Sequence, residues 1–182
     1  MAIYPAQYET TAVLRDGSSL VLVRPICPDD AGAVLAFHAR LSPLSLYHRF
    51  FSPVPRLAPE QLRHLVEVDY VDSMALVAQQ DERIVGVTHC FRYEGGYHAD
   101  VSVAVEDACQ GQGIGPTLLE HLTHLARDRG ITVFDADVLA ENRRMLRILA
   151  QTGLPMSRVL HMGVVHVEIS LTSRTSSGGP LG

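Results

Sequence analysis

The sequence lacks the features that mark several classes of protein. Its three cysteines, Cys27, Cys90 and Cys109, are odd in number and widely spaced, which excludes a disulfide framework or a cysteine-based zinc site and indicates a reducing, cytoplasmic location. No apolar run reaches about 18 residues, so no membrane span is predicted. Residues 1–9 lack a basic region followed by an apolar core, so no secretory signal is predicted.

Positive charge is also scarce, because the formal net charge is −5. Broad nucleic-acid binding needs a surplus of cationic side chains, so we do not expect it. What is present is a globular composition, with 47% apolar and 19% charged residues, and the 182 residues suit one domain. We expect an N-terminal arm over 1–18, a folded domain over 19–171, and a disordered tail rich in Ser, Thr and Gly over 172–182.

Alternating and helical patterns predict a mixed α/β sheet. We expect strands over 19–24, 75–79, 84–93, 98–105 and 132–138, and one long strand or two strands joined at Gly163 over 159–171. We expect helices after Pro28 with Asp29 or Asp30 as the N-cap, over 44–51 with Ser42 as a possible cap, over 59–68, after the glycine-rich stretch at 110–116, and over 143–152. Strands in a row, followed by strand–helix–strand–helix, favour this fold class.

The glycine-rich stretch Gln110–Pro116 carries the strongest functional signal. Alternating valines precede it and leucines at helical spacing follow it, so the pattern predicts a strand, a tight turn and a helix. Its three glycines let the backbone approach a ligand closely, and Pro116 suits the first helical position because it has no N–H. Free N–H groups at a helix N-terminus bind anions. We interpret the stretch as a pyrophosphate cradle, with a tight turn that binds no ligand as the alternative.

Two common phosphate motifs do not fit this stretch. The dinucleotide pattern G-x-G-x-x-G would place its third glycine on Pro116, and the P-loop would need a lysine that is absent. The pattern Q/R-x-x-G-x-G/A does fit, at Gln110, Gly113 and Gly115, and it resembles the coenzyme A pyrophosphate motif of the GNAT N-acetyltransferase superfamily. The block from Val138 through Asn142 to Gly153 is similar to a second motif of that superfamily, with leucine where phenylalanine is usual.

The resemblance to the GNAT superfamily covers about residues 20–171. Within the superfamily, one group of enzymes is especially similar. Several segments are similar to the acetyltransferase domain of bacterial Pat-type protein lysine acetyltransferases, which modify acyl-CoA synthetases: Val23–Ile26, Asp29–Asp30, Leu41–Ser42, Ser45–Tyr47, Arg49–Ser52 and Val68–Tyr70. The resemblance implies a single-domain GNAT acyl-CoA N-acyltransferase fold. In that fold the strands over 98–105 and 132–138 run parallel and splay apart, and the gap holds the pantetheine arm. It also implies acetyl-CoA as co-substrate and no metal.

Acetyl transfer from a thioester to an amine needs a base and hydrogen-bond donors for the developing negative charge. The resemblance implies that the backbone of Val103, Ala104 and Val105 pairs with the pantetheine and donates to the thioester carbonyl. It assigns the pyrophosphate to Gln110, Gly111, Gln112, Gly113, Ile114 and Gly115. Gln112 stands where Arg or Lys is frequent, so a phosphate-binding charge is missing there. Asn142 would bond to the pantetheine or to a bridging water, or cap its helix, and these two roles can coexist.

The candidate base is Asp100. Pat-type sequences carry a catalytic glutamate at this place, and here the segment reads Ala99-Asp100, with a side chain shorter by about 1.5 Å that a bridging water could extend. A solvated carboxylate without a catalytic role is the alternative, and His89 or His98 could be the base instead. No tyrosine follows Tyr97 to act as the acid, so the thiolate would leave unaided. Cys109 lacks a recognisable relay and is not expected to be a nucleophile.

These patterns predict an acetyl-CoA-dependent N-acetyltransferase. By the resemblance, the acceptor would be a lysine side chain on a protein such as an acyl-CoA synthetase, attacked directly, with no nucleic acid or membrane involved and a homodimer possible. Acetylation of a small-molecule amine and a non-catalytic acyl-CoA-binding module remain alternatives. His161, His166 and Glu168 alternate along the last strand region, where they line the acceptor side or are ordinary residues of an edge strand.

Overall fold

The fold is an eight-stranded mixed sheet, given by a computed structural model that describes residues 3–52, 56–94 and 96–172. The strands are β1 (Thr10–Val13), β2 (Leu20–Pro25), β3 (Ser73–Gln80), β4 (Arg83–Arg92), β5 (His98–Val105), β6 (Val133–Leu139), β7 (Met156–His161) and β8 (Val164–Ser170). Their order across the sheet is β1-β2-β3-β4-β5-β6-β8-β7. Neighbouring strands are antiparallel except β5 and β6, which run parallel, so the expected α/β class with a mixed sheet is confirmed.

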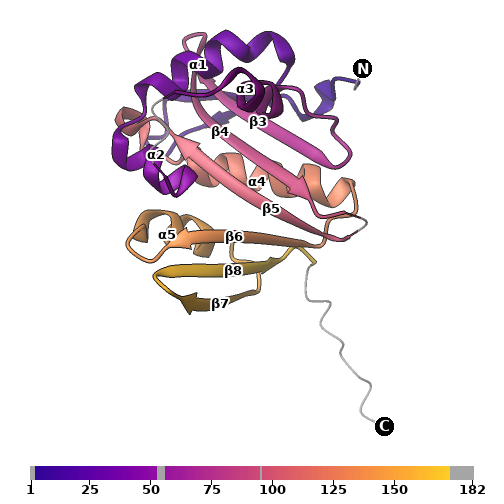
Figure 1. Cartoon of the computed structure of the whole chain (residues 1–182). Coiled ribbons are helices and arrows are strands. Elements are labelled where there is room, and N and C mark those ends of the chain that lie inside the picture. Colours follow the sequence, from indigo (N-terminus) through magenta and orange to yellow (C-terminus); the bar gives the residue numbers. More distant parts are fainter. Residues whose placement is uncertain (1–2, 53–55, 95, 173–182) are drawn as a thin grey trace.

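Five α-helices accompany the sheet within the described part of the chain. They are α1 (Ala31–Arg40), α2 (Pro43–Phe50), α3 (Pro59–Val66), α4 (Ile114–Asp128) and α5 (Arg143–Ala150). In Figure 1, α4 lies behind β4 and β5, whereas α1, α2 and α3 gather at the end of the view opposite β6, β8 and β7. None of the helices in the described ranges is long and apolar enough to cross a membrane.

The core lies between α4 and the central strands. Leu118, Leu119, Leu122 and Leu125 of α4 are spaced at helical intervals and are fully buried. The central strand β3 is buried on both faces from Met74 to Ala78, as expected for a strand covered by helices on either side. This burial gives β4 and β5 a rigid support on the side of α4.

Helix caps follow the local sequence in two of the helices that flank the later site. Ser42 caps α2, because its hydroxyl accepts a hydrogen bond from the Ser45 N–H at 3.2 Å. Asn142 caps α5 in the same way, accepting from the Met145 N–H at 3.1 Å. The expected Ser42 cap is therefore confirmed, and Asn142 fulfils the capping role that was one of its two predicted roles.

Three local details differ from the sequence-based expectations. Part of the expected arm, Thr10–Val13, pairs with β2 as an edge strand, because alternate residues of that segment pack inward. Pro116 is the third helical residue rather than the first, because α4 already begins at Ile114 after Gly113. Asp30 does occupy the N-cap position of α1, but its carboxylate accepts from Arg24 and the Cys27 N–H and makes no capping hydrogen bond to the helix.

The end of the chain folds as a hairpin. Residues 156–170 form two strands that turn at Met162 and Gly163, where both residues have positive φ (45° and 80°), so the two-strand alternative is confirmed. The expected tail over 172–182 lies outside the described residues from 173 onward.

Candidate active site

The site opens where β5 and β6 separate. Their parallel pairing ends at Asp100 opposite Asp135, although the strands continue to Val105 and Leu139. In Figure 1 the two strands are close at one end and diverge toward the end where α5 lies. A cleft of about 720 Å³ occupies the gap and is lined by both strands, the glycine-rich turn, α2 and α5. The predicted splay is therefore present.

The glycine-rich turn presents unused hydrogen-bond donors to this cleft. Gly111 and Gly113 have φ of 87° and 101°, which an L-residue with a side chain rarely adopts. Among the described residues, none accepts a hydrogen bond from the backbone N–H groups of 111–115. These groups converge at the N-terminus of α4, whose dipole adds partial positive charge. The turn therefore offers donors that an anion such as a pyrophosphate could use, and its binding role stays a prediction.

The close packing around the turn also depends on glycine. A Cβ built on Gly115 would lie 3.1 Å from Ile148 Cδ1, 3.7 Å from Val105 and 3.9 Å from Val103. Because Val103 and Val105 face α4, their neighbours Ser102 and Asp100 belong to the opposite face of β5. A larger residue at 115 would push α4, α5 and β5 apart and would change the width of the cleft.

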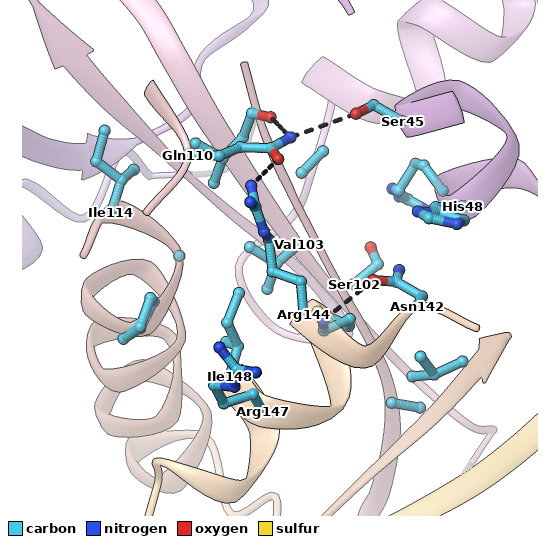
Figure 2. Close-up of a pocket in the computed structure, with 18 of the residues that line it drawn as sticks. Ser45, His48, Ser102, Val103, Gln110, Ile114, Asn142, Arg144, Arg147 and Ile148 are labelled. Atoms are coloured by element: carbon cyan, nitrogen blue, oxygen red, sulfur yellow. Dashed lines mark hydrogen bonds between the residues drawn. The ribbon is translucent and has the colours of Figure 1, made fainter. Parts of the chain in front are cut away.

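Positive charge in the cleft comes from arginines that the sequence reasoning missed. Arg15, Arg143, Arg144 and Arg147 line it, and Figure 2 shows Arg144 and Arg147 on α5 beside the turn. Arg144 donates a hydrogen bond to Gln110 Oε1, and Arg15 donates to Gln151 at 2.8 Å. The only feature of the sequence that could have indicated these cleft residues is the spacing of Arg143, Arg144 and Arg147 along the helix that follows Asn142.

The two predicted glutamines occupy different surroundings. Gln110 lines the cleft, and its amide nitrogen donates to Val105 O at 2.9 Å and Ser45 Oγ at 3.3 Å, which fixes the turn against the end of β5 and against α2 (Figure 2). Gln112 is exposed and donates to Ala108 O at 3.3 Å, and it does not line the cleft. Only the backbone of Gln112 is therefore placed to contact a phosphate.

Asp100 lines the cleft at the point where the strands part. Burial raises the pKa of its carboxyl above the ordinary value, nearby Arg49 lowers it, and the carboxylates of Asp137 and Asp135 raise it further. Asp137 also lines the cleft. A partly desolvated carboxylate with a raised pKa has the properties of a general base.

The two histidines weighed as alternative bases are engaged elsewhere. His89 is only 4% exposed, and its Nε2 lies 2.9 Å from Leu65 O. Burial, with help from Arg49, lowers the pKa of His89 to about 3, so the ring is neutral. The His98 ring bonds to Asp135 through Nδ1 at 2.9 Å and is not among the residues that line the cleft. Cys109 is a free, buried thiol.

Arg49 is a further cleft residue to which the sequence reasoning assigned no role. It projects from the last turn of α2 into the cleft, and its guanidinium carbon lies 5.1 Å from the centre of the Phe50 ring. Burial lowers its pKa, and the charge of Asp100 raises it. The pair places one cation and one carboxylate at the end of the cleft far from the turn.

Comparison with known proteins agrees with this geometry. Residues 43–154 match the model of the Acetyltransferase (GNAT) family. The chain is 30% identical over 142 residues to Acetyltransferase PA5475 of Pseudomonas aeruginosa, covering 76% of each protein. It is 32% identical over 157 residues to Acetyltransferase Pat of Mycolicibacterium smegmatis, covering 82% of this chain but 45% of Pat, so it spans less than half of that relative.

A solved structure shows the same fold. The crystal structure of the GNAT domain of S. lividans PAT superposes with a TM-score of 0.87 and is 35% identical, covering 92% of this chain and 99% of that domain. The expected resemblance to Pat-type domains is therefore confirmed. Together with the cradle and the splayed strands, these matches show that the chain belongs to the GNAT family and is an acetyltransferase of that type.

Proposed function

We propose that the chain transfers an acetyl group from acetyl-CoA to the side-chain amine of a protein lysine, with Asp100 as general base. The observation that carries this proposal is the position of Asp100, which lines the cleft at the point where β5 and β6 separate. The glycine-rich turn, with the free N–H groups of 111–115, lines the other end. Asp100 and Val105 are five residues apart, about 17 Å along a strand. The cleft thus has an end suited to an anion and a distant end suited to an amine.

The cradle end suits the phosphates of coenzyme A. The unused donors of Gly111–Gly115 and the dipole of α4 favour a pyrophosphate, and Arg144 and Arg147 add charge-assisted hydrogen bonds. The pantetheine would continue along the backbone of Val103–Val105, which has no strand partner on the β6 side past Asp100. Asn142, whose carbonyl oxygen caps α5, keeps its amide N–H groups for the pantetheine or a bridging water.

The chemistry requires one proton transfer and one bond exchange. The amine nitrogen forms a bond to the thioester carbonyl carbon, the carbon–sulfur bond breaks, and the sulfur leaves as a thiolate. Asp100 accepts the proton that the nitrogen loses through bridging water, because its side chain is short and about 10 Å of strand separates it from Val103. Backbone N–H groups of Val103–Val105 stabilise the negative charge on the carbonyl oxygen.

The acceptor is assigned from charge and from relatives. Asp100, Asp137 and Glu141 all line the cleft and favour an ammonium group. The similarity to Pat and to the S. lividans PAT domain supports the Pat-type resemblance, and that resemblance implies a protein acceptor, for example an acyl-CoA synthetase. All three cysteines are free thiols, which fits a reaction in the reducing cytoplasm.

A labelling experiment tests the proposal. Purified chain is incubated with radiolabelled acetyl-CoA and an acyl-CoA synthetase, with a panel of small primary amines in parallel. The sequence contains no lysine, so a lysine-acetylated band cannot be the enzyme itself. We expect label on a lysine of the synthetase, lost by about 100-fold or more in Asp100→Asn and retained in Asp29→Asn, whose side chain is exposed and does not line the cleft.

The other outcomes would overturn specific parts of the proposal. Label only in a small amine would replace the protein acceptor. Wild-type activity in Asp100→Asn would remove the base assignment. No transfer at all, with acetyl-CoA still raising the melting temperature, would identify a non-catalytic acyl-CoA-binding module.

A further inference from the structure

A polar cluster lies on the sheet beside the cleft, and of its residues only Asp137 has a part in the proposed function. It comprises His98 on β5, Asp135 and Asp137 on β6, and His166 and Glu168 on β8. Asp135 is directly opposite Glu168, and Asp137 is directly opposite His166. Residues directly opposite each other point to the same face, and residues two apart on one strand share that face. All five side chains therefore belong to one face of three adjacent strands.

The side chains converge on Asp135. Its carboxylate is only 5% exposed, and one oxygen lies 2.9 Å from His98 Nδ1 while the other lies 3.5 Å from His166 Nε2. One ligand atom each from His98, Asp135 and Glu168 lies within 4.8 Å of the others. His166 Nδ1 lies 2.8 Å from Asp137 Oδ1. A buried carboxylate thus faces two imidazoles and a second carboxylate.

We propose that His98, Asp135 and Glu168 bind a Zn²⁺ ion, and that the bound ion inhibits acetyl transfer. The sequence alone predicted no metal, because the ligands come from three strands that are far apart in the chain. Imidazole nitrogen and carboxylate oxygen are ligands that zinc accepts, and three such groups with one water complete its usual coordination.

The spacing is close to what one ion requires. Zinc bonds to nitrogen and oxygen are about 2.0–2.2 Å, so two ligands of one ion lie at most about 4.4 Å apart. The ligand atoms of His98, Asp135 and Glu168 lie within 4.8 Å of one another, so their widest separation has to close by at most about 0.4 Å, which small side-chain rotations supply.

His166 lies beside these three ligands and contacts one of them. Its Nε2 lies 3.5 Å from Asp135 Oδ1, and its Nδ1 lies 2.8 Å from Asp137 Oδ1. Carboxylates that bind a metal are commonly held in place by a second layer of polar groups. His166 occupies such a place and would orient the Asp135 carboxylate toward the ion.

Inhibition follows from where the ion would sit. Asp135 is opposite Asp100 at the last paired position of β5 and β6, and Asp137 lines the cleft. A dication there neutralises the carboxylates that attract a cationic acceptor and repels the ammonium group. We therefore expect zinc to raise the KM for the amine acceptor and to leave the KM for acetyl-CoA unchanged. This inhibitory part rests on the proposed function, whereas zinc binding does not.

The binding test needs no catalysis. Chelator-treated protein is titrated with zinc in a calorimeter, with Mg²⁺ as the comparison ion, and we expect one zinc equivalent per chain and no magnesium signal. Glu168→Gln removes an exposed ligand with little risk to folding, and Asp135→Asn removes the buried one. We expect at least a tenfold loss of zinc affinity in both. His161→Ala, an exposed histidine on β7 outside the cluster, should bind like wild type.

Unchanged zinc affinity in Glu168→Gln, with circular dichroism showing a folded protein, would overturn the site even if Asp135→Asn fails to fold. The activity test adds zinc to the labelling assay, with EDTA to reverse its effect. Zinc binding without inhibition would overturn the inhibitory part alone. Failure of the proposed function would instead appear as absence of transfer before any zinc is added, so the two failures are distinguishable.

Discussion

Removing the α5 arginines should weaken acetyl-CoA binding and leave the chemistry intact. Arg144 and Arg147 are one turn apart on α5 and line the cleft beside the glycine-rich turn (Figure 2). A hydrogen bond to a charged group contributes about 1.5–3 kcal/mol, which corresponds to roughly 10- to 150-fold in Kd. Both side chains are exposed, so solvent and salt screen them, and the lower end of that range applies.

We therefore expect Arg144→Gln and Arg147→Gln each to raise the Kd for coenzyme A by about tenfold at low salt. The double variant should lose close to the product of the two effects, unless both arginines contact the same phosphate. Calorimetry with coenzyme A measures the change. Arg158→Gln is the matched control, because Arg158 is an exposed arginine on β7 that does not line the cleft.

A ligand without phosphate separates charge from packing. Acetyl-pantetheine presents the same thioester and arm but no pyrophosphate, so its KM should be the same in wild type and in both arginine variants. Salt should weaken coenzyme A binding more in wild type than in the double variant. The reasoning is refuted if both variants bind coenzyme A like wild type, or if they lose acetyl-pantetheine to the same extent.

Three further predictions concern stability and can be measured by chemical unfolding. Gly113→Ala should lower the free energy of unfolding by roughly 1–2 kcal/mol, since φ is 101° and the new Cβ would lie 2.9 Å from Arg15 Cγ. Gly17→Ala is the control. Gly17 also has positive φ, but a Cβ there meets no atom within 4 Å, so this variant measures the backbone cost alone. Tyr70→Phe should cost about 1–2 kcal/mol, because the buried hydroxyl donates to Ile26 O at 2.5 Å and lies 3.2 Å from Ala75 O. Burial raises the pKa of the Asp30 carboxyl. Hydrogen bonds from Arg24 and Cys27 lower this pKa by more than burial raises it, so it lies below the usual value. The stability that Asp30 contributes is thus present above the unfolded pKa of about 3.9 and lost as the pH falls through the folded value. Asp30→Asn should lower the free energy of unfolding at pH 7 and should reduce how much of it is lost between about pH 5 and pH 2. If the variant loses as much stability as wild type over that pH range, Asp30 does not make this contribution.

Sequence patterns predicted the parts of the site that depend on local backbone. Glycines at alternate positions between a strand and a helix are informative because positive φ and close approach are properties of single residues, and Gly111 and Gly113 do have positive φ. The exact start of α4 was beyond this reasoning. Pro116 tolerates any position in the first turn, where N–H groups have no helical partner, so it could not fix the first residue.

The arginines were missed for a different physical reason. Arg144 contacts Gln110, which lies 34 positions away in the chain, and Arg15 reaches the turn from the segment between β1 and β2. Such contacts depend on how α5 and the N-terminal segment pack, which periodicity does not specify. The sequence has no charge at Gln112, whereas Arg144 and Arg147 of α5 line the cleft and bring positive charge to it.

The location of charge matters more than its sum for this reaction. Coenzyme A is a polyanion and a lysine acceptor is a cation, so one cleft has to attract both without letting them pair with each other. Arg144 and Arg147 lie at the cradle, whereas Asp100 and Asp137 lie toward the place where β5 and β6 meet, with Arg49 offsetting part of their charge. The net charge of −5 conceals this separation. Because β5 runs between the two ends, the strand that carries Asp100, the proposed base, also sets the distance between the two proposed binding regions.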